Sequence, residues 1–158
     1  MAYKITTPEA GYQPIAVTDT TQNHALGETV LGVDPTYGGG RFVYAKGVAS
    51  TAVGDVVTIA TGFTTVRGVA SGRGKVAVAM SANVANQYGW YQVEGEAVVN
   101  AAGTIVASTP AYLTATAGSV DDAVVSGDKI DGFVFSAART GAGTTTAILS
   151  NPSANGNG

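Results

Sequence analysis

The sequence contains no cysteine, one histidine and one tryptophan among its 158 residues, and only 12% of its residues are charged. The lack of cysteine excludes disulfide bonds and thiolate metal sites. Soluble domains usually carry about 25% charged residues, so Thr, Ser, Asn, Gly and Ala must fill many surface positions here. A surface of this kind suits a chain whose faces are covered by other protein subunits.

Basic clusters and long hydrophobic runs are also missing. The eight Lys and Arg residues are spread singly, with Arg73 and Lys75 the closest pair, and the net charge is −3. Nucleic-acid binding is disfavoured because no basic stripe can neutralise phosphates. The most apolar window, KVAVAMSANVA, is too short to cross a bilayer, and the N-terminal MAYKITTPEAGYQP lacks the apolar region of a secretory signal. We expect neither nucleic acid nor a membrane as a partner.

From Arg41 onward the sequence is a series of short segments rich in β-branched and aromatic residues, which is typical of strands. In RFVYAKGVA, Phe42 and Tyr44 lie on one face and Val43 lies on the other. Similar segments are GDVVTIAT, KVAVAM, GWYQVEGEAVV, GTIVAS, AYLTATA, DGFVFSAA and TTTAILS. The length suits one domain. The pattern therefore predicts a mainly β fold, a single compact β-barrel or β-sandwich-like domain over residues 41–150.

One segment departs from the β pattern. In SANVANQYG, residues 81–89, Ser81 suits the N-cap of a helix and Gly89 suits the position just after a helix. We expect a short helix here, and at most one or two short helices in the whole chain.

Residues 1–40 differ from the rest of the chain. They contain three prolines, Thr-rich turns and thinly spaced apolar residues with no sustained period. We predict an extended N-terminal arm, with an ordinary ragged terminus as the alternative. The glycines of TYGGGR would form the joint to the β domain, and residues 151–158 would form a flexible C-terminal tail. The expected anchors of the arm are Tyr3, Ile5, Tyr12 and Ile15.

Glu94 and Glu96 follow the only tryptophan and raise the question of a glycosidase site. Residues at i and i+2 of a strand share a face, about 7 Å apart, and glycosidase carboxyl groups lie about 5–9.5 Å apart. Such enzymes usually draw the two acids from separate elements across a cleft, so a solvated or interface face is favoured. Trp90 and Tyr91 point to opposite faces and cannot form one sugar platform, so we expect one in the core and the other at an interface.

His24 is the only histidine, so a Ser–His–Asp triad or an imidazole metal site would have to use it. It lies in TTQNHALGE, and the chain has no G-x-S-x-G motif, so we expect a surface or packing residue.

Four aspartates in GSVDDAVVSGDKIDG do not fit the spacing of a calcium loop; these are Asp121, Asp122, Asp128 and Asp131. Turn acids are favoured, with a weak cation site as the alternative. We expect no catalytic residue, no cofactor and no metal.

Several parts of the sequence resemble the head decoration, or cement, proteins of tailed bacteriophages. They are GRFVYAKGVASTAVGDVVTI, AMSANVANQYGWYQVEGEAVV, TPAYLTATAGSVDDAVVSGDKIDGFVFSAA and a polar tail, and they cover about residues 28–150. The most specific piece is ANQYGWYQVEGEA. The resemblance implies a non-enzymatic β domain, often a homotrimer, on the outer capsid surface of the virion. There it would bind the major capsid protein and lock capsomers together, frequently with an extended N-terminal arm.

In such a protein, aromatic residues would serve as packing or interface anchors. The expected anchors are Phe42, Tyr44, Tyr88, Trp90 and Tyr91. A trimer that repeats weak contacts would bind with avidity. The alternative is a receptor- or glycan-binding module of a phage fibre or spike, in which Asn83, Asn86 and Gln87 would converge beside Tyr88.

Overall fold

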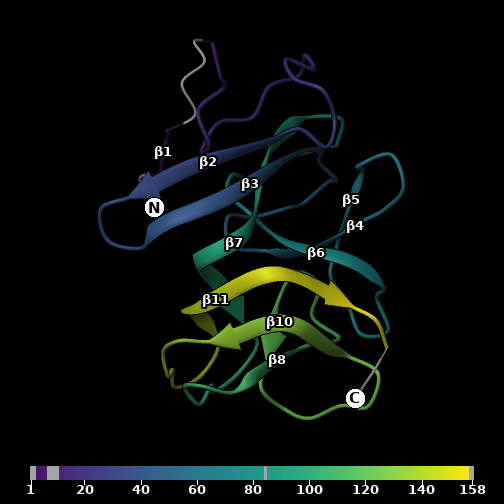
Figure 1. Cartoon of the computed structure of the whole chain (residues 1–158). Coiled ribbons are helices and arrows are strands. Elements are labelled where there is room, and N and C mark those ends of the chain that lie inside the picture. The colour runs from purple at the N-terminus through teal and green to yellow at the C-terminus, as the bar shows by residue number, and fades with distance from the viewer. Residues whose placement is uncertain (1–2, 7–10, 84, 157–158) are drawn as a thin grey trace.

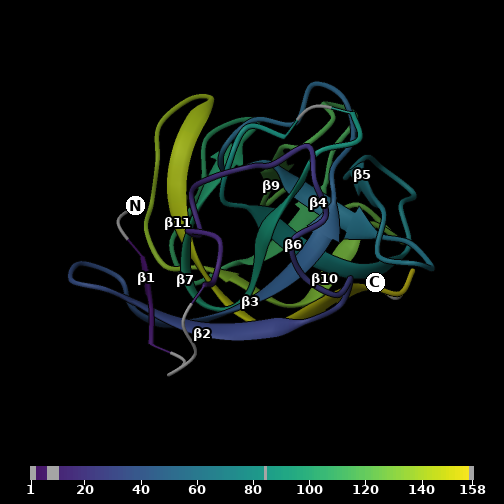
Figure 2. The same ribbon diagram turned by 90° about the horizontal axis from the view of Figure 1, so that it is seen from above.

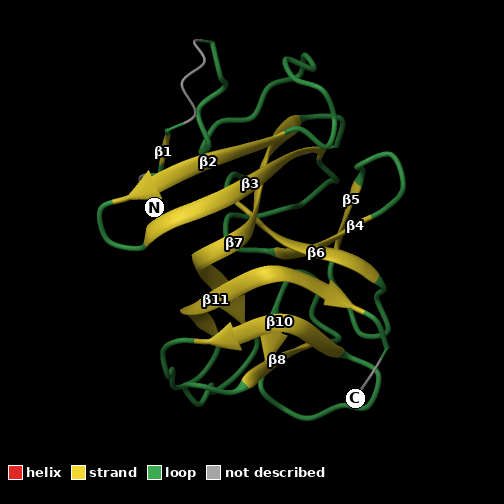
Figure 3. Ribbon diagram, viewed as in Figure 1, coloured by secondary structure: helices red, strands yellow, loops and turns green. Residues whose placement is uncertain are grey.

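The structure is a computed structural model that describes residues 3–6, 11–83 and 85–156. These residues form strands, turns and loops but no helix (Figure 3), so they contain no helix that could span a membrane. They form an 11-stranded sheet. The strands are β1 (Lys4–Ile5), β2 (Thr29–Asp34), β3 (Gly38–Lys46), β4 (Val56–Ile59), β5 (Thr65–Arg67), β6 (Gly74–Ala79), β7 (Tyr88–Ala101), β8 (Pro110–Leu113), β9 (Val120–Asp121), β10 (Lys129–Phe135) and β11 (Gly143–Ala154). The predicted mainly β fold is confirmed.

Strand β7 connects the two halves of the sheet. Its first part pairs with β3 and β6, and its second part pairs with β11 and, at its end, with β9. One closed circuit of strands runs from β7 through β9, β8, β10 and β11 back to β7. A second runs from β7 through β6, β4 and β5 to β3, where a bridge joins Lys46 to Thr64. Figure 1 shows β1–β3 above, β8, β10 and β11 below, and β7 passing between them.

The period of two along the strands sorts the buried side chains into three clusters. Neighbouring residues of one strand enter different clusters, as Trp90 and Tyr91 do. The N-terminal cluster contains Tyr3, Ile15, Val30, Phe42, Tyr44, Met80 and Trp90. The middle cluster contains Val43, Ala45, Val57, Ile59, Ala77, Ala79 and Tyr91. The C-terminal cluster includes Val76, Val78, Ile105, Leu113, Phe133, Phe135 and Leu149.

The predicted boundary after residue 40 falls inside β3. Strands β2 and β3 form an antiparallel hairpin that includes residues 38–40. The Asp34 side chain fixes its turn, because Oδ1 accepts hydrogen bonds from the N–H groups of Thr36 and Tyr37 at 2.7 and 3.1 Å. The three glycines led to the prediction of a flexible joint, because glycine is common in such joints. In the structure they are part of the sheet. Of the three, only Gly40 lies so close to β7 that a Cβ atom would crowd it, and Gly95 of β7 packs directly against the backbone of β3.

The rest of the described N-terminal segment lies on the chain's own β domain. Figure 2, seen from above, shows the purple segment crossing over the strands. Lys4 pairs with Val33 of β2, and an isolated bridge joins Asp19 to Tyr88 of β7. The part of the predicted arm at residues 7–10 lies outside the described residues.

The predicted helix at residues 81–89 is wrong for the part that the structure describes, residues 81–83 and 85–89. The chain makes a turn with Asn86 at a φ of 65° and enters β7 at Tyr88. Asn83 is fully buried, and its amide donates a hydrogen bond of 2.7 Å to the Tyr91 hydroxyl. Ser and Gly suit turns as well as helix ends, and these tertiary contacts select the turn.

Two other segments differ from the expectation. GTIVAS, residues 103–108, is a loop in which Ile105 forms an isolated bridge with Arg139 and the Ser108 N–H donates a hydrogen bond of 2.8 Å to the Phe135 carbonyl of β10. Strand β11 continues to Ala154, and Ser153 pairs with both β10 and β6. The predicted flexible tail therefore begins inside a strand, and residues 157–158 lie outside the described residues.

Candidate functional site

The N-terminal segment meets the β domain at a group of packed rings, the aromatic junction of Tyr12, His24, Tyr44 and Trp90. Trp90 is fully buried, and its ring centroid lies 4.9 Å from that of Tyr44 and 5.4 Å from that of His24. His24 stacks on Tyr12 at 5.0 Å with an angle of 14° between the rings. Offset and tilted ring pairs of this kind stabilise a fold beyond the area that they bury.

Gln13 supplies the hydrogen bonds of this junction. Its backbone carbonyl accepts a hydrogen bond from the Trp90 indole N–H at 2.9 Å, and its backbone N–H donates to His24 Nε2 at 3.1 Å. Its side-chain oxygen accepts from the Tyr44 hydroxyl at 3.1 Å. A His24 nitrogen that accepts a hydrogen bond holds no proton. His24 is therefore a packing residue, as the sequence predicts.

All four predicted arm anchors, Tyr3, Ile5, Tyr12 and Ile15, contact the N-terminal cluster of their own chain. The Tyr3 ring packs edge-on against Phe42 with 4.9 Å between centroids. The Tyr3 hydroxyl donates a hydrogen bond to the backbone carbonyl of Glu96 on β7. Burial raises the pKa of this hydroxyl above its ordinary value. The structure therefore brings the arm anchors and the β-domain anchors together within one chain.

Four of the five predicted β-domain anchors have no exposed surface. Phe42, Tyr44 and Trp90 lie in the N-terminal cluster, and Tyr91 lies in the middle cluster. Only Tyr88, stacked beside Tyr44 at 6.3 Å, is partly exposed. The four buried rings act in packing and offer no surface to a partner in this structure.

A buried polar site that sequence reasoning missed surrounds Asp55, which is 2% exposed. Its carboxylate accepts hydrogen bonds from Arg67 Nε at 2.8 Å and from the Asn100 amide at 2.9 Å. Buried charges are usually paired in this way. The partners lie 12 and 45 residues away along the chain, so no local pattern signals the site.

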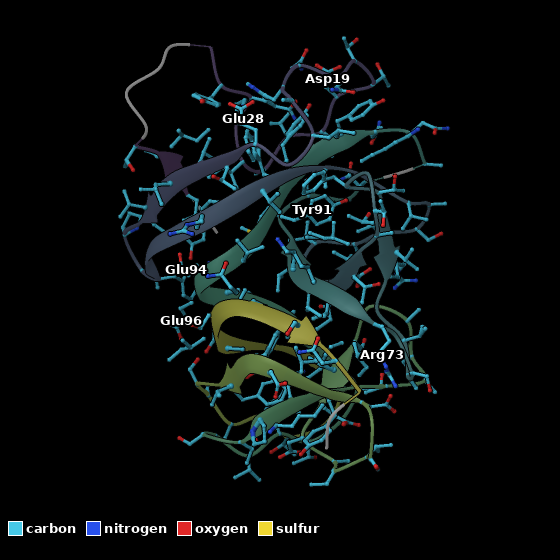
Figure 4. All side chains as sticks on the ribbon, turned by 45° about the vertical axis from the view of Figure 1, so that its right-hand side comes forward. Asp19, Glu28, Arg73, Tyr91, Glu94 and Glu96 are labelled. Carbon is cyan, nitrogen blue, oxygen red and sulfur yellow. The ribbon has the colours of Figure 1, made fainter. Side chains whose placement is uncertain are left out.

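Glu94 and Glu96 bind different partners on the surface where β7 passes between the two halves (Figure 4). The Glu94 carboxylate lies 3.1 Å from Arg41 Nε, and Glu96 accepts a hydrogen bond of 2.7 Å from the Ser136 hydroxyl. Gly95 between them has a φ of 95°, which breaks the regular alternation of the strand. Each acid therefore binds a partner of its own.

The four aspartates singled out in the sequence each bind a backbone or side-chain group of their own, and Asp128 is buried. Asp121, Asp122 and Asp128 each accept a hydrogen bond from a backbone N–H, at 3.1, 2.8 and 2.5 Å. Asp131 lies 3.6 Å from Lys129 Nζ. Within the described ranges, no group of three or more His, Asp or Glu side chains is arranged to hold a metal ion.

The surface has two features that sequence reasoning did not identify. A cavity of about 350 Å³, which we call the mouth cavity, opens at one end of the middle cluster. It is lined by Gly27, Thr29, Arg41, Val43, Ile59, Phe63, Lys75, Val76, Val93, Asn151 and Pro152. The second feature is a set of large apolar side chains on outward positions. Val134 and Ile148, directly paired on β10 and β11, are 42% and 54% exposed.

A search against models of protein families finds no match, and a comparison with curated proteins finds none either.

Proposed function

We propose that this protein is a structural virion protein that binds the outer surface of a phage capsid and stabilises contacts between major capsid protein subunits. This role is supported by the different positions of the reactive and the apolar side chains. The residues that could carry chemistry, such as His24 and Glu94, are held by neighbours of the same chain. Apolar residues, in contrast, occupy outward positions.

The outward apolar positions form two surfaces suited to protein partners. On β10 and β11, Val134 and Ile148 lie side by side, and Ile148 also pairs with Glu96. On β2, Leu31 and Val33 are 53% and 44% exposed. Single exposed apolar residues are ordinary, but neighbouring ones rimmed by polar residues are typical of interaction sites. With only 12% charged residues in the chain, such faces favour a partner over open solvent.

A cement role also favours a homo-oligomer, and we propose a trimer. Each copy would contribute one modest contact to the capsid, and several linked contacts bind far more tightly than one. The competing glycan-binding role has less support, because Asn83, which it would need at the surface, is fully buried.

The proposal is tested on phage particles purified on a density gradient from cultures that produce this protein. We expect mass spectrometry to find the protein in the same band as the major capsid protein. Purified protein should rebind particles stripped of it, and Ile148→Asp should weaken rebinding. Val66→Asp, at a position that is 49% exposed on β5, is the matched control. A particle band that contains the major capsid protein but never this protein overturns the proposal.

A further inference from the structure

The mouth cavity combines an apolar wall with a cationic rim. The wall is built by aliphatic and aromatic side chains, which include Val43, Ile59, Phe63 and Val93. None of the described residues that line the cavity is acidic. Its charged residues are Arg41 and Lys75. The shape and chemistry suit an apolar group that carries negative charge beside it.

Both cations, Lys75 and Arg41, have N–H donors that can bind a negatively charged group. The Lys75 ammonium forms no hydrogen bond or ion pair with any residue that the structure describes. Arg41 contacts Glu94 through Nε, but a guanidinium has five N–H donors, so others remain for a second carboxylate. Asn151, which also lines the cavity, donates a hydrogen bond to Glu94 at 3.3 Å, and Glu94 itself is not among the lining residues.

The complementary feature lies on the loop between β9 and β10, which we call the valine loop, residues 121–128. Val124 is 79% exposed, the highest value among the large apolar side chains that the structure describes, and Val125 is 45% exposed. Asp121 and Asp122 lie just before them. The loop is thus an apolar tip beside two carboxylates.

The valine loop is held in shape at both ends. Asp122 accepts a hydrogen bond from the Val106 N–H at 2.8 Å, and Asp128 accepts one from the Ser71 N–H. Each carboxylate keeps further lone pairs for a cation. A preformed loop loses little conformational entropy when it binds. Two exposed valines on a fixed loop suit insertion into a pocket.

We propose that the valine loop of one copy inserts into the mouth cavity of a second copy. Val124 enters the apolar wall, and the Asp121 and Asp122 carboxylates face Lys75 and Arg41. Burial of the valine provides the main attraction, and the opposite charges set the orientation and exclude other partners. The contact supplies the self-association that the proposed function calls for, but it does not depend on a capsid.

The valine loop and the lining of the mouth cavity share no residue. The valine loop is at the lower end of Figure 1, below β8 and β10, whereas the mouth cavity adjoins β3, β6 and β11. Each copy therefore offers one loop and one cavity. A contact between unlike surfaces closes into a ring when the rotation between copies permits it, and the proposed trimer is such a ring.

The test uses the full chain in solution without particles. Sedimentation velocity at micromolar concentration should show an oligomer for the unmodified protein. Val124→Asp and Lys75→Glu should each weaken association at least tenfold. Val124→Asp would place a charge against the apolar wall, and Lys75→Glu would replace a positive charge at the rim with a negative one. The matched controls are Val17→Asp, at a position that is 47% exposed, and Lys4→Glu on β1. All four variants change exposed residues and should keep the circular dichroism spectrum of the unmodified protein.

Mixing the two disrupted variants distinguishes this contact from any other interface. The Val124→Asp copy keeps an intact cavity, and the Lys75→Glu copy keeps an intact loop. Each variant alone should associate at least tenfold more weakly than the unmodified protein, whereas the mixture should form dimers through one intact junction. Because the chain has no cysteine, Val124→Cys mixed with Thr29→Cys should also give a disulfide dimer on oxidation.

Three results would overturn the inference: a monomeric unmodified protein, an oligomer that both disrupted variants leave unchanged, or no dimer in the mixture. If self-association behaves as expected and the protein is absent from particles, only the proposed function fails. If the protein binds particles as a monomer, this inference and the proposed trimer fail, and the proposed binding to the capsid stands.

Discussion

The indole N–H of Trp90 donates a hydrogen bond of 2.9 Å to the backbone carbonyl of Gln13, across 77 residues of chain. This bond joins the N-terminal segment to the longest strand of the sheet. It also satisfies the one polar atom of a ring that is otherwise buried among apolar groups. The N-terminal segment therefore completes the N-terminal cluster.

Deleting residues 1–28 should destabilise the domain. The deletion removes Tyr3, Gln13 and Ile15 and exposes Trp90 to water. Loss of a few buried apolar side chains costs several kcal/mol, a large share of a domain stability of about 5–15 kcal/mol. The melting temperature should fall, and tryptophan emission should shift to longer wavelength; Trp90 is the only tryptophan, so the signal reports this site. A chain ending at residue 156 is the control. An unchanged melting temperature would show that the segment only rests on a complete domain.

Substitution of Gly95 by alanine should be strongly destabilising. Gly95 has a φ of 95°, and a Cβ atom there would overlap the carbonyl oxygen of Gly39. Strain at such a backbone conformation costs about 1–3 kcal/mol, and the overlap adds to it. Gly103→Ala is the control, because nothing lies within 4 Å of a Cβ atom at that position. Urea denaturation should show a clear decrease in the free energy of unfolding for Gly95→Ala and almost none for Gly103→Ala. Equal decreases for the two variants would contradict this explanation.

The double change Glu94→Gln and Glu96→Gln should alter stability by less than about 1 kcal/mol. The Glu94–Arg41 ion pair has side chains that are 37% and 44% exposed, and exposed pairs contribute about 0–1 kcal/mol. We also expect no change in activity on a panel of polysaccharides. Hydrolysis by the unmodified protein that disappears in the double variant would restore the glycosidase hypothesis.

Asp55→Ala should destabilise the protein by about 1–3 kcal/mol, because it leaves the partly buried donors of Arg67 and Asn100 without their acceptor. The control is Asp131→Ala, whose ion pair with Lys129 is exposed and should change stability little. Thermal unfolding of both variants is the measurement. A similar effect for the two aspartates would mean that the buried network contributes nothing.

Stability should fall above about pH 10, and Tyr91 should contribute to the fall. Burial raises the pKa of Tyr91 above its ordinary value of 10.0. Above the ordinary pKa the unfolded chain has released the phenol proton while the native state still holds it, so the free energy of unfolding decreases as pH rises. Denaturation from pH 9 to 11.5 should show a shallower decline for Tyr91→Phe, with circular dichroism at pH 7 confirming that the variant is folded. The same slope for both proteins would exclude a contribution from Tyr91.

The strands could be predicted from the sequence because side-chain alternation is a local property. Phe42 and Tyr44 do share one cluster, and Val43 does face another, as RFVYAKGVA predicts. The expected helix failed at Asn83, where a buried hydrogen bond to Tyr91 decides the backbone. The expected joint at residues 38–40 lies inside strand β3, where the missing side chain of Gly40 permits close packing on β7 that composition alone cannot distinguish from a flexible joint.

The sequence by itself determined the class of the fold and the packing role of its few reactive side chains. Short alternating segments bounded by turn residues can bury one face at a time, and a chain with one histidine and no cysteine has few catalytic options. Only the tertiary structure decided which strands share β7, where the N-terminal segment docks, and which residues surround Asp55. Those features depend on contacts between residues far apart in the chain, such as Trp90 with Gln13, and such contacts leave no local pattern in the sequence.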